Sequence, residues 1–229
     1  IRMTYNTEGI ILRYRDIGEY DRIYSVLTRD HGKVDGWAQG VRKPQSKLVA
    51  HLQPLYFCDF MIARGRRFDR IAQVRVINYW AEVWSNLEKI GEAVYAVSLV
   101  DLVLRPGTKE GRVFELLQSF LEIMSTPSLS LTPTLSQRER GIGWGEGASQ
   151  KSPRPAGEGQ GEGILIFFSL KLLKESGFAP ELRNCVLCKA VVEGLSRHFD
   201  AIRGGVLCEE CFRKAGVEAF SVSSLTIET

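Results

Sequence analysis

The chain has 229 residues and a formal net charge of +3, and this length is enough for one large core with smaller modules. No apolar run approaches the roughly 18 residues of a membrane-spanning helix and no secretory signal is visible, so we expect a cytoplasmic protein without a membrane partner. Residues 1–80 hold 14 Lys+Arg against 8 Asp+Glu, a net charge of +6, whereas the remainder carries −3. A basic domain on a mildly acidic body is typical of proteins that bind polyanions, although such charges also coat small barrels that bind nothing.

Short strands separated by tight turns are predicted across the basic region. The first run alternates, with Ile10, Leu12 and Tyr14 on one face, so we expect one face in the core and the other against a partner. Five such strands and one long polar loop, residues 40–48, predict a Greek-key barrel of the OB type over residues 1–80. The predicted strands are residues 7–15, 22–29, 34–38, 55–63 and 68–77.

Aromatic side chains lie among the arginines of this region. Stacking of a base on such a ring contributes about 1–3 kcal/mol, and Lys or Arg contacts with phosphate add salt-dependent affinity. The pattern therefore favours nucleic-acid binding. Some of the rings must instead belong to the core, and their positions along the chain leave open which ones. The rings are Tyr14, Tyr20, Tyr24, Trp37 and Phe68.

Helical periodicity replaces the strand pattern after residue 80. An amphipathic helix is predicted for residues 81–105, ended by Pro106 and Gly107, and a second for residues 110–124. A third pattern covers residues 164–176 and has a glycine cap directly after it. We expect the first two helices to pack on each other and on the barrel, and a groove for a partner peptide is the alternative use of their apolar faces. The expected apolar positions are Val83, Leu87, Ile90, Val94, Val97 and Val103 in the first helix, and Val113, Leu116, Leu117, Phe120, Leu121 and Met124 in the second.

Residues 126–163 differ from their surroundings because prolines and alternating glycines dominate them. Such a composition buries too little apolar surface to offset the backbone entropy of folding, so we expect a disordered insertion between two helices. The hypothesis is that this insertion is dispensable. Deletion of residues 127–162 should then leave thermal unfolding unchanged.

Two cysteine pairs form the sharpest motif of the chain. Cys185 and Cys188 are separated from Cys208 and Cys211 by 19 residues, the spacing of a four-cysteine zinc site with a hairpin between two knuckles. Two disulfides are the alternative, which a cytoplasmic location disfavours. Binding of one structural Zn²⁺ would supply the folding energy that so small a segment lacks. The resulting divisions are residues 1–80 for the barrel, 81–184 for a helical domain containing the insertion, 185–211 for the zinc module and 212–229 for a C-terminal tail.

A catalytic zinc fits less well, because four thiolate ligands leave no position for an activated water. The His-x-Glu and Pro-Cys-x-x-Cys motifs of nucleic-acid deaminases are missing, and we expect His198 to decorate the hairpin. Cys58 is expected to be a buried thiol of a strand. Neither a nucleotide-binding P-loop nor a nucleophile elbow is present, so nothing in the sequence indicates an enzyme.

Several stretches, in this order, resemble the RecO family of bacterial recombination mediators. The resemblance implies an N-terminal OB-fold, a helical domain and a zinc module in a non-enzymatic, nucleoid-associated protein of the RecF pathway. It also implies binding of single-stranded and double-stranded DNA, annealing of complementary strands, and action with RecR and single-strand-binding protein (SSB) in loading RecA. The matching stretches are residues 7–12, 18–23, 27–33, 40–43, 52–54 and 177–182.

The resemblance is carried to individual residues only where basic side chains lie in matching stretches. Two departures are visible: the insertion, and an end soon after the zinc module where the family continues into a further helix. We therefore expect a truncation that affects the surface for the acidic C-terminal tail of SSB. The alternative functions are a scaffold whose barrel binds protein, and then a metal-dependent hydrolase. The expected DNA contacts are Arg13, Arg15, Arg22, Lys33, Arg42, Lys43 and Lys47, with Arg66 and Arg67 added from their position in a hairpin.

Overall fold

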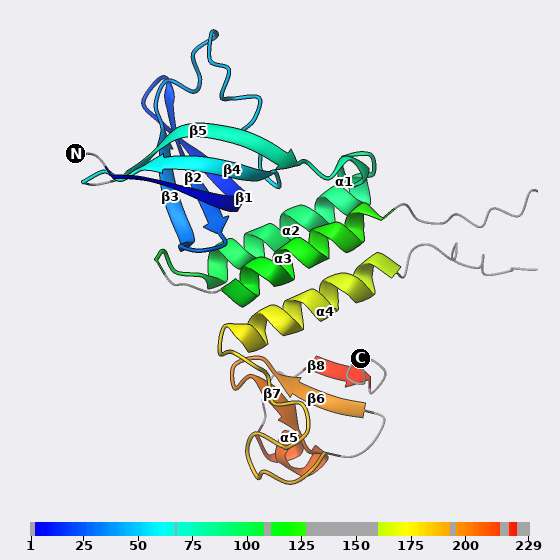
Figure 1. Cartoon of the computed structure of the whole chain (residues 1–229). Helices are drawn as coiled ribbons and strands as arrows, with labels where there is room; N and C mark the ends of the chain where they lie inside the picture. The colour runs from blue at the N-terminus through cyan, green and yellow to red at the C-terminus, as the bar shows by residue number, and fades with distance from the viewer. Residues whose placement is uncertain are drawn as a thin grey trace, which may run out of the picture.

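The structure is a computed structural model that describes residues 3–66, 68–107, 111–126, 160–192, 196–215 and 220–223. Figure 1 shows three layers: a β-barrel, a layer of long helices, and a small C-terminal module on the far side of the helices. The α+β multi-module architecture predicted from the sequence is therefore confirmed. Residues 127–159, most of the predicted insertion, lie outside the described residues.

The N-terminal strands close into a barrel in the order β1-β2-β3-β5-β4. Neighbouring strands are antiparallel except β3 and β5, which pair in parallel through only two residue pairs. All five predicted strands are present, which confirms the OB-type barrel. The strands are β1 (Thr4–Ile17), β2 (Asp21–Thr28), β3 (Gly32–Ala38), β4 (Phe57–Ala63) and β5 (Asp69–Asn78).

One detail of β1 differs from the prediction: Tyr14 does not share a face with Ile10 and Leu12. The register with β2 shifts between Ile11 and Arg13, and beyond the shift Tyr14 is paired with an inward-facing residue of β2. A β-bulge of this kind adds one residue to a strand and reverses the alternation that follows it. The bulge thus moves Tyr14 to the inner face of the strand.

The two faces of the barrel wall contact different partners. Ile11 and Phe60, both fully buried, belong to the barrel interior. Ile10 and Leu27 point outward and pack in a second cluster with residues of the helical layer. The face that was predicted to meet a partner is therefore covered, over this half of the strands, by helices of the same chain.

The helical layer contains α1 (Ala81–Trp84), α2 (Leu87–Val103), α3 (Gly111–Ser125) and α4 (Gln160–Glu175). Asn86 divides the predicted first helix in two, because its side chain accepts hydrogen bonds from the backbone N–H groups of Glu88 and Lys89 and caps α2. The fourth helix begins at Gln160, so the last residues of the predicted insertion are helical. Gly177 follows α4 with a φ of 80°, as expected of a left-handed cap.

The buried face of α2 agrees only in part with the predicted one. Val97 is buried as predicted, and Val103 packs against the core cluster. Leu87 and Val94, however, are 83% and 45% exposed, and the remaining buried side chains are those of Ala93, Ala96 and Val100, which were not predicted. Because this helix carries apolar residues on every side, periodicity alone does not identify the face in contact. In α3 the polar and apolar faces are distinct, and the predicted face is the one that packs. Its packed residues are Val113, Leu116, Leu117, Phe120, Leu121 and Met124.

A buried lysine joins the barrel to the helical layer. Lys33 Nζ on β3 lies 2.6 Å from the carbonyl oxygen of Asp101, 3.2 Å from that of Leu104 and 2.7 Å from Asp101 Oδ1. These carbonyls end α2, where a positive charge is favourable. The Lys33 side chain is only 6% exposed, so the expectation that it contacts DNA is wrong.

The C-terminal module contains β6 (Ser196–Asp200), β7 (Gly205–Leu207), α5 (Glu209–Ala215) and β8 (Phe220–Ser223). Its strands form a sheet in the order β7-β6-β8. Residues that were predicted to be a C-terminal tail therefore contribute a helix end and a strand to the module. Within the described part of the chain, no helix has the combination of length and apolarity that crossing a bilayer demands.

Candidate functional site

A groove of about 1190 Å³ runs along the part of the barrel wall that the helices leave open. Cross-strand partners lie on the same face of a sheet, and Ile23 of β2 is paired with both Arg15 of β1 and Trp37 of β3. Trp37 is also paired with Arg70 at the start of β5, and the turn between β4 and β5 completes the lining. The lining includes Ile17, Asp21, Ile23, Trp37 and Gln39 on the sheet side, and Arg64, Arg66, Phe68 and Arg70 on the hairpin side.

Trp37 is held in a fixed orientation at the floor of this groove. Its Nε1 donates a hydrogen bond to Asp21 Oδ2 at 3.1 Å, and the backbone N–H of Gly40 donates to Asp21 Oδ1 at 2.7 Å. The half-buried indole therefore has little rotamer freedom left to lose when a planar group stacks on it.

The hairpin supplies positive charge at the rim. Arg64, Arg66 and Arg70 are exposed, and the Arg64 guanidinium lies 5.5 Å from the centre of the Tyr5 ring. Among the described residues, none of these three arginines takes part in an ion pair. Sequence reasoning named Arg66 but missed Arg64 and Arg70, although both flank the turn that it predicted.

The other predicted DNA contacts are dispersed. Arg13 pairs with Asp101 at the junction with α2, and Lys47 lies in a separate hollow beside the outer face of β4 and β5. Arg67 lies outside the described residues. Of the predicted set, the groove contains Arg66, with Arg15 on the same face of the sheet.

Arg22, Arg42 and Lys43 gather on the other side of the β1–β2 hairpin. Arg22 Nε donates to Asp16 Oδ1 at 2.7 Å, and Arg42 Nη1 lies 3.3 Å from Asp16 Oδ2. Two tyrosine rings lie beside these cations. The Arg22 guanidinium is 4.1 Å from the centre of the Tyr14 ring, and Lys43 Nζ is 5.6 Å from the centre of the Tyr20 ring. We call Tyr14, Asp16, Tyr20, Arg22, Arg42 and Lys43 the hairpin cluster.

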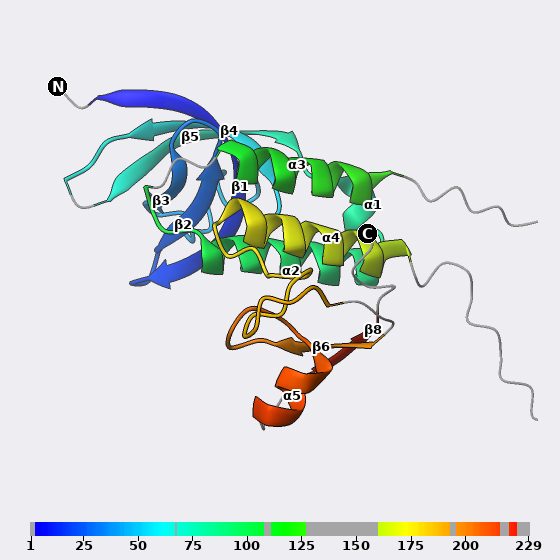
Figure 2. The same cartoon turned by 90° about the horizontal axis from the view of Figure 1, so that it is seen from below.

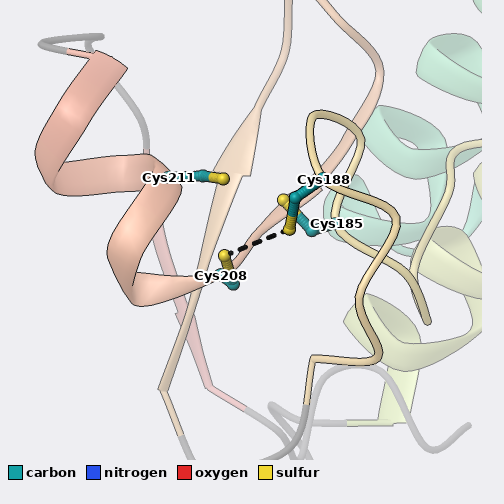
Figure 3. A group of neighbouring side chains, drawn as sticks. All are labelled: Cys185, Cys188, Cys208 and Cys211. Atoms are coloured by element: carbon teal, nitrogen blue, oxygen red, sulfur yellow. Dashed lines mark hydrogen bonds between the residues drawn. The ribbon is translucent and has the colours of Figure 1, made fainter.

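The four cysteines of the C-terminal module converge, as Figure 3 shows. Their sulfur atoms all lie within 4.8 Å of one another, and Cys188 Sγ is 3.6 Å from Cys208 Sγ. Cys185 and Cys188 come from a turn, whereas Cys208 and Cys211 lie before and within α5 after the β6–β7 hairpin. The predicted pair of knuckles with an intervening hairpin is present.

The electrostatics of this centre favour a thiolate at one position. Burial opposes ionisation of Cys185, but backbone N–H groups of Cys188, Cys208 and Leu187 donate to its sulfur and lower its pKa to about 6. Hydrogen bonding of the Cys211 thiol to Cys208 raises the pKa of Cys211 to about 12. Sulfurs about 3.8 Å apart are expected around a tetrahedral metal with four thiolates, so this donor set fits such a site.

His198 lies beside the cysteine group and is not part of it. Its ring stacks on Phe212 with centroids 3.7 Å apart, and its Nε2 is 3.1 Å from Glu209 Oε2. The alternative of disulfides is not what the structure contains, because all five cysteines are free. Cys58 is buried in the barrel, as predicted.

A third hollow of about 470 Å³ lies between α3 and α4. Its floor is apolar, with Phe167 and Ile123 each 50% exposed. Lys171 and Arg112 stand at its edges, the latter 3.5 Å from Glu175. A peptide groove was considered only for the predicted helices at 81–105 and 110–124, so its position between α3 and α4 was not predicted.

Two family models match the chain. The model described as "Recombination protein O N terminal" matches residues 3–80, which cover the whole barrel. The model described as "Recombination protein O C terminal" matches residues 156–226, which include α4 and the cysteine module.

Curated relatives extend this match over nearly the whole chain. A protein of Rubrobacter xylanophilus is 32% identical over 223 residues, 97% of this chain and 77% of that protein. A protein of Symbiobacterium thermophilum is 30% identical over 227 residues, which are 98% of this chain and 78% of that protein. A protein of Alkaliphilus metalliredigens is 28% identical over 220 residues, which are 96% of this chain and 76% of that protein. All three are named DNA repair protein RecO. The barrel, the four-cysteine module and these similarities together establish that the chain belongs to the RecO family of DNA repair proteins.

Proposed function

We propose that this protein binds single-stranded DNA in the barrel groove, with bases stacked on Trp37 and phosphates on the arginines of the β4–β5 hairpin. The observation that carries the proposal is that the fixed indole lines one groove together with Arg64, Arg66 and Arg70, of which Arg70 is its cross-strand partner on β5. Strands β2 and β3 and the loops at this end are the surface on which OB-folds bind oligonucleotides. Double-stranded DNA binds the same arginines through its phosphates alone.

Annealing of complementary strands requires no covalent chemistry. Cations that neutralise the phosphates of two strands reduce their repulsion, and stacking on exchangeable rings leaves each base free to move to a Watson–Crick partner. The protein acts in this way as a non-enzymatic mediator at the nucleoid, assisting the loading of RecA onto SSB-coated DNA together with RecR.

Fluorescence anisotropy of a labelled oligothymidine across a salt series tests DNA binding. Replacing Arg64, Arg66 and Arg70 by alanine should weaken binding and reduce the slope of log affinity against log salt by about 2, at roughly 0.7 per phosphate contact. The matched control removes Arg105, Arg213 and Lys214, exposed cations remote from the groove, and should leave the slope unchanged. A slope that is equal in all three proteins would favour the scaffold alternative, in which the barrel binds protein.

We further propose that the four cysteines bind one structural Zn²⁺. Cys185, Cys188, Cys208 and Cys211 would hold it, and the metal would supply folding energy to the module and no reaction, because four thiolates complete its coordination. Boundaries at residues 80 and 184 then separate the barrel, the helical domain and the zinc module.

The groove between α3 and α4 is the place we propose for the acidic tail of SSB. An apolar floor with Lys171 beside it suits a peptide that combines acidic residues with an apolar end. The lining also contains Glu115 and Glu175, and Arg112 is paired with Glu175, so Lys171 is the cation on which the proposal relies. Replacing Phe167 by alanine and Lys171 by glutamate should abolish binding of an SSB-tail peptide in calorimetry and leave oligothymidine binding intact. Unchanged peptide affinity would place the tail elsewhere.

A further inference from the structure

The β1–β2 hairpin separates two surfaces that have the same chemistry. Side chains that alternate along a strand point to opposite faces, and cross-strand partners share a face. Ile17, Asp21 and Ile23 face the groove, whereas the pair Asp16 and Arg22 faces the other side. The groove and the hairpin cluster are thus back to back on one two-stranded element, which Figure 2 shows at the barrel end remote from α1.

The hairpin cluster has the components of a site for single-stranded nucleic acid. Its rings are accessible, with Tyr14 39% exposed and Tyr20 48% exposed, and a cation lies over each of them. Its three cations exceed its one carboxylate, so a net positive charge remains for phosphate. Exposed rings beside exposed cations bind successive nucleotides without sequence preference.

Asp16 distinguishes this surface from the groove. Its two carboxylate oxygens hold Arg22 at 2.7 Å and Arg42 at 3.3 Å, so a phosphate must replace a carboxylate that is already in place. In the groove, by contrast, Asp21 accepts hydrogen bonds from two neutral groups, the Trp37 indole N–H and the Gly40 backbone N–H. The described arginines of the groove form no ion pair with Asp21. Nucleic acid on the cluster therefore competes with an internal anion, which lowers affinity and speeds release.

We propose that the hairpin cluster binds a second single strand, and that Asp16 keeps this binding weak so that the strand passes readily to its complement in the groove. This inference rests on the proposed binding of DNA in the groove and extends it to the number of strands. The strand in the groove is held on one side of the hairpin and the exchanging strand on the other. The two meet at the exposed turn, residues 18–20, that joins β1 to β2.

Native mass spectrometry of the full chain with a short oligothymidine counts the strands directly. The unmodified protein should bind two oligonucleotides per chain, the second more weakly. Combined Arg64→Ala, Arg66→Ala and Arg70→Ala substitutions should leave one, and combined Tyr20→Ala, Arg42→Ala and Lys43→Ala substitutions should also leave one. All six positions are exposed, and thermal unfolding of each variant verifies folding. Lys43→Glu alone should weaken the second strand if the triple variant does not fold.

Asp16→Asn tests the role of the carboxylate. It should tighten the weaker site by roughly fivefold, since it frees the exposed Arg42 and the partly buried Arg22 from their carboxylate partner. It should also slow annealing of complementary strands because release becomes slower. Glu8→Gln is the matched control, because Glu8 pairs with Arg29 at 3.0 Å and is 44% exposed, as Asp16 is. The control should change neither quantity. Tighter binding with slower annealing is a combination that a structural role of Asp16 would not produce.

The outcomes separate the two proposals. One oligonucleotide per chain, lost with the groove variant and unaffected by the cluster variant, would overturn the second strand and leave the groove proposal standing. If the cluster variant bound no oligonucleotide while the groove variant bound as the unmodified protein does, both proposals would be overturned. Annealing that is equally fast in Asp16→Asn would overturn the role given to the carboxylate.

Discussion

The barrel and the C-terminal module differ in how each obtains its stability. The barrel interior is filled by large side chains such as Tyr24, Phe60 and Ile62, all nearly inaccessible to solvent. The apolar core of the module contains only four buried residues among those described, and one of them is Cys185 itself. A core that small contributes little, so the module depends on what its cysteines bind, whereas the barrel depends on burial of apolar surface.

The helical layer belongs with the barrel in this comparison. One apolar cluster includes Leu27 and Phe57 of the barrel together with Phe114 of α3, and the rings of Phe57 and Phe114 are 6.0 Å apart. Because barrel and helices share this cluster, we expect them to unfold together. The module should respond separately, to metal.

Removal of the metal should have the largest effect. Cys185→Ser, or a strong chelator, should unfold the module because zinc binding contributes about 10–16 kcal/mol in small zinc peptides. Limited proteolysis should then cleave the C-terminal module and spare the barrel. Cys58→Ala provides the control, since Cys58 lies in the barrel and should leave the zinc content at one per chain. Simultaneous loss of the barrel would show that the two regions are not independent.

Lys33→Met should have the next largest effect. The substitution leaves Asp101, whose side chain is 15% exposed, without its buried partner, and such a loss costs about 3–5 kcal/mol. Chemical denaturation should show the loss in the transition of barrel and helices, while zinc retention stays normal. Arg13→Ala removes the exposed partner of the same carboxylate and should cost about 1 kcal/mol or less. If both variants lost the same free energy of unfolding, the burial of Lys33 would not be the reason for its contribution to stability.

A smaller difference is expected in the reactivity of the cysteine thiols of the barrel and of the C-terminal module. Burial raises the pKa of Cys58 to about 12, so this group stays a thiol at pH 8. The depressed pKa of Cys185 makes that group a thiolate above about pH 6. That pKa belongs to the folded module. In metal-free protein the module is expected to be unfolded, and its cysteines are then accessible and partly ionised at pH 8. Iodoacetamide should therefore modify the module and spare Cys58, as measured by peptide mass spectrometry. Labelling of Cys58 before denaturation would contradict the tight packing of the barrel.

Shortening the insertion should have the smallest effect. Figure 1 shows the end of α3 and the start of α4 at the same edge of the helical layer, so a short Gly-Ser linker in place of residues 128–158 should connect them. A shorter loop closes at lower entropic cost, and stability should stay equal or rise by about 1 kcal/mol. The measurement is the thermal midpoint, with oligothymidine affinity alongside. A fall of many degrees would mean that the insertion contributes contacts to the barrel and helices.

Local patterns in the sequence were sufficient for the strands, for the buried face of α3 and for the cysteine pairs. Turn residues and alternation mark short strands, a sharp polar and apolar division marks one face of a helix, and the spacing of Cys185, Cys188, Cys208 and Cys211 fits a metal site. Each of these signals is a relation between residues near one another in the chain. The same local reasoning succeeded only in part for α2, where Val97 is buried as predicted but Leu87 and Val94 are exposed, because apolar residues surround the helix.

Only the tertiary structure decided which charged residues are available at the surface. Lys33 looked like its basic neighbours, yet the end of α2 buries it, and a single bulge moved Tyr14 to the other face of β1. The groove depends on Trp37 from β3 and on Arg64, Arg66 and Arg70 of the β4–β5 hairpin. Barrel closure brings them together from 27, 29 and 33 positions apart in the sequence. The sequence by itself therefore determined the kinds of elements and the ligand chemistry of the cysteines. The location of the proposed nucleic-acid surface followed from long-range packing, because burial and strand register are properties of the closed barrel.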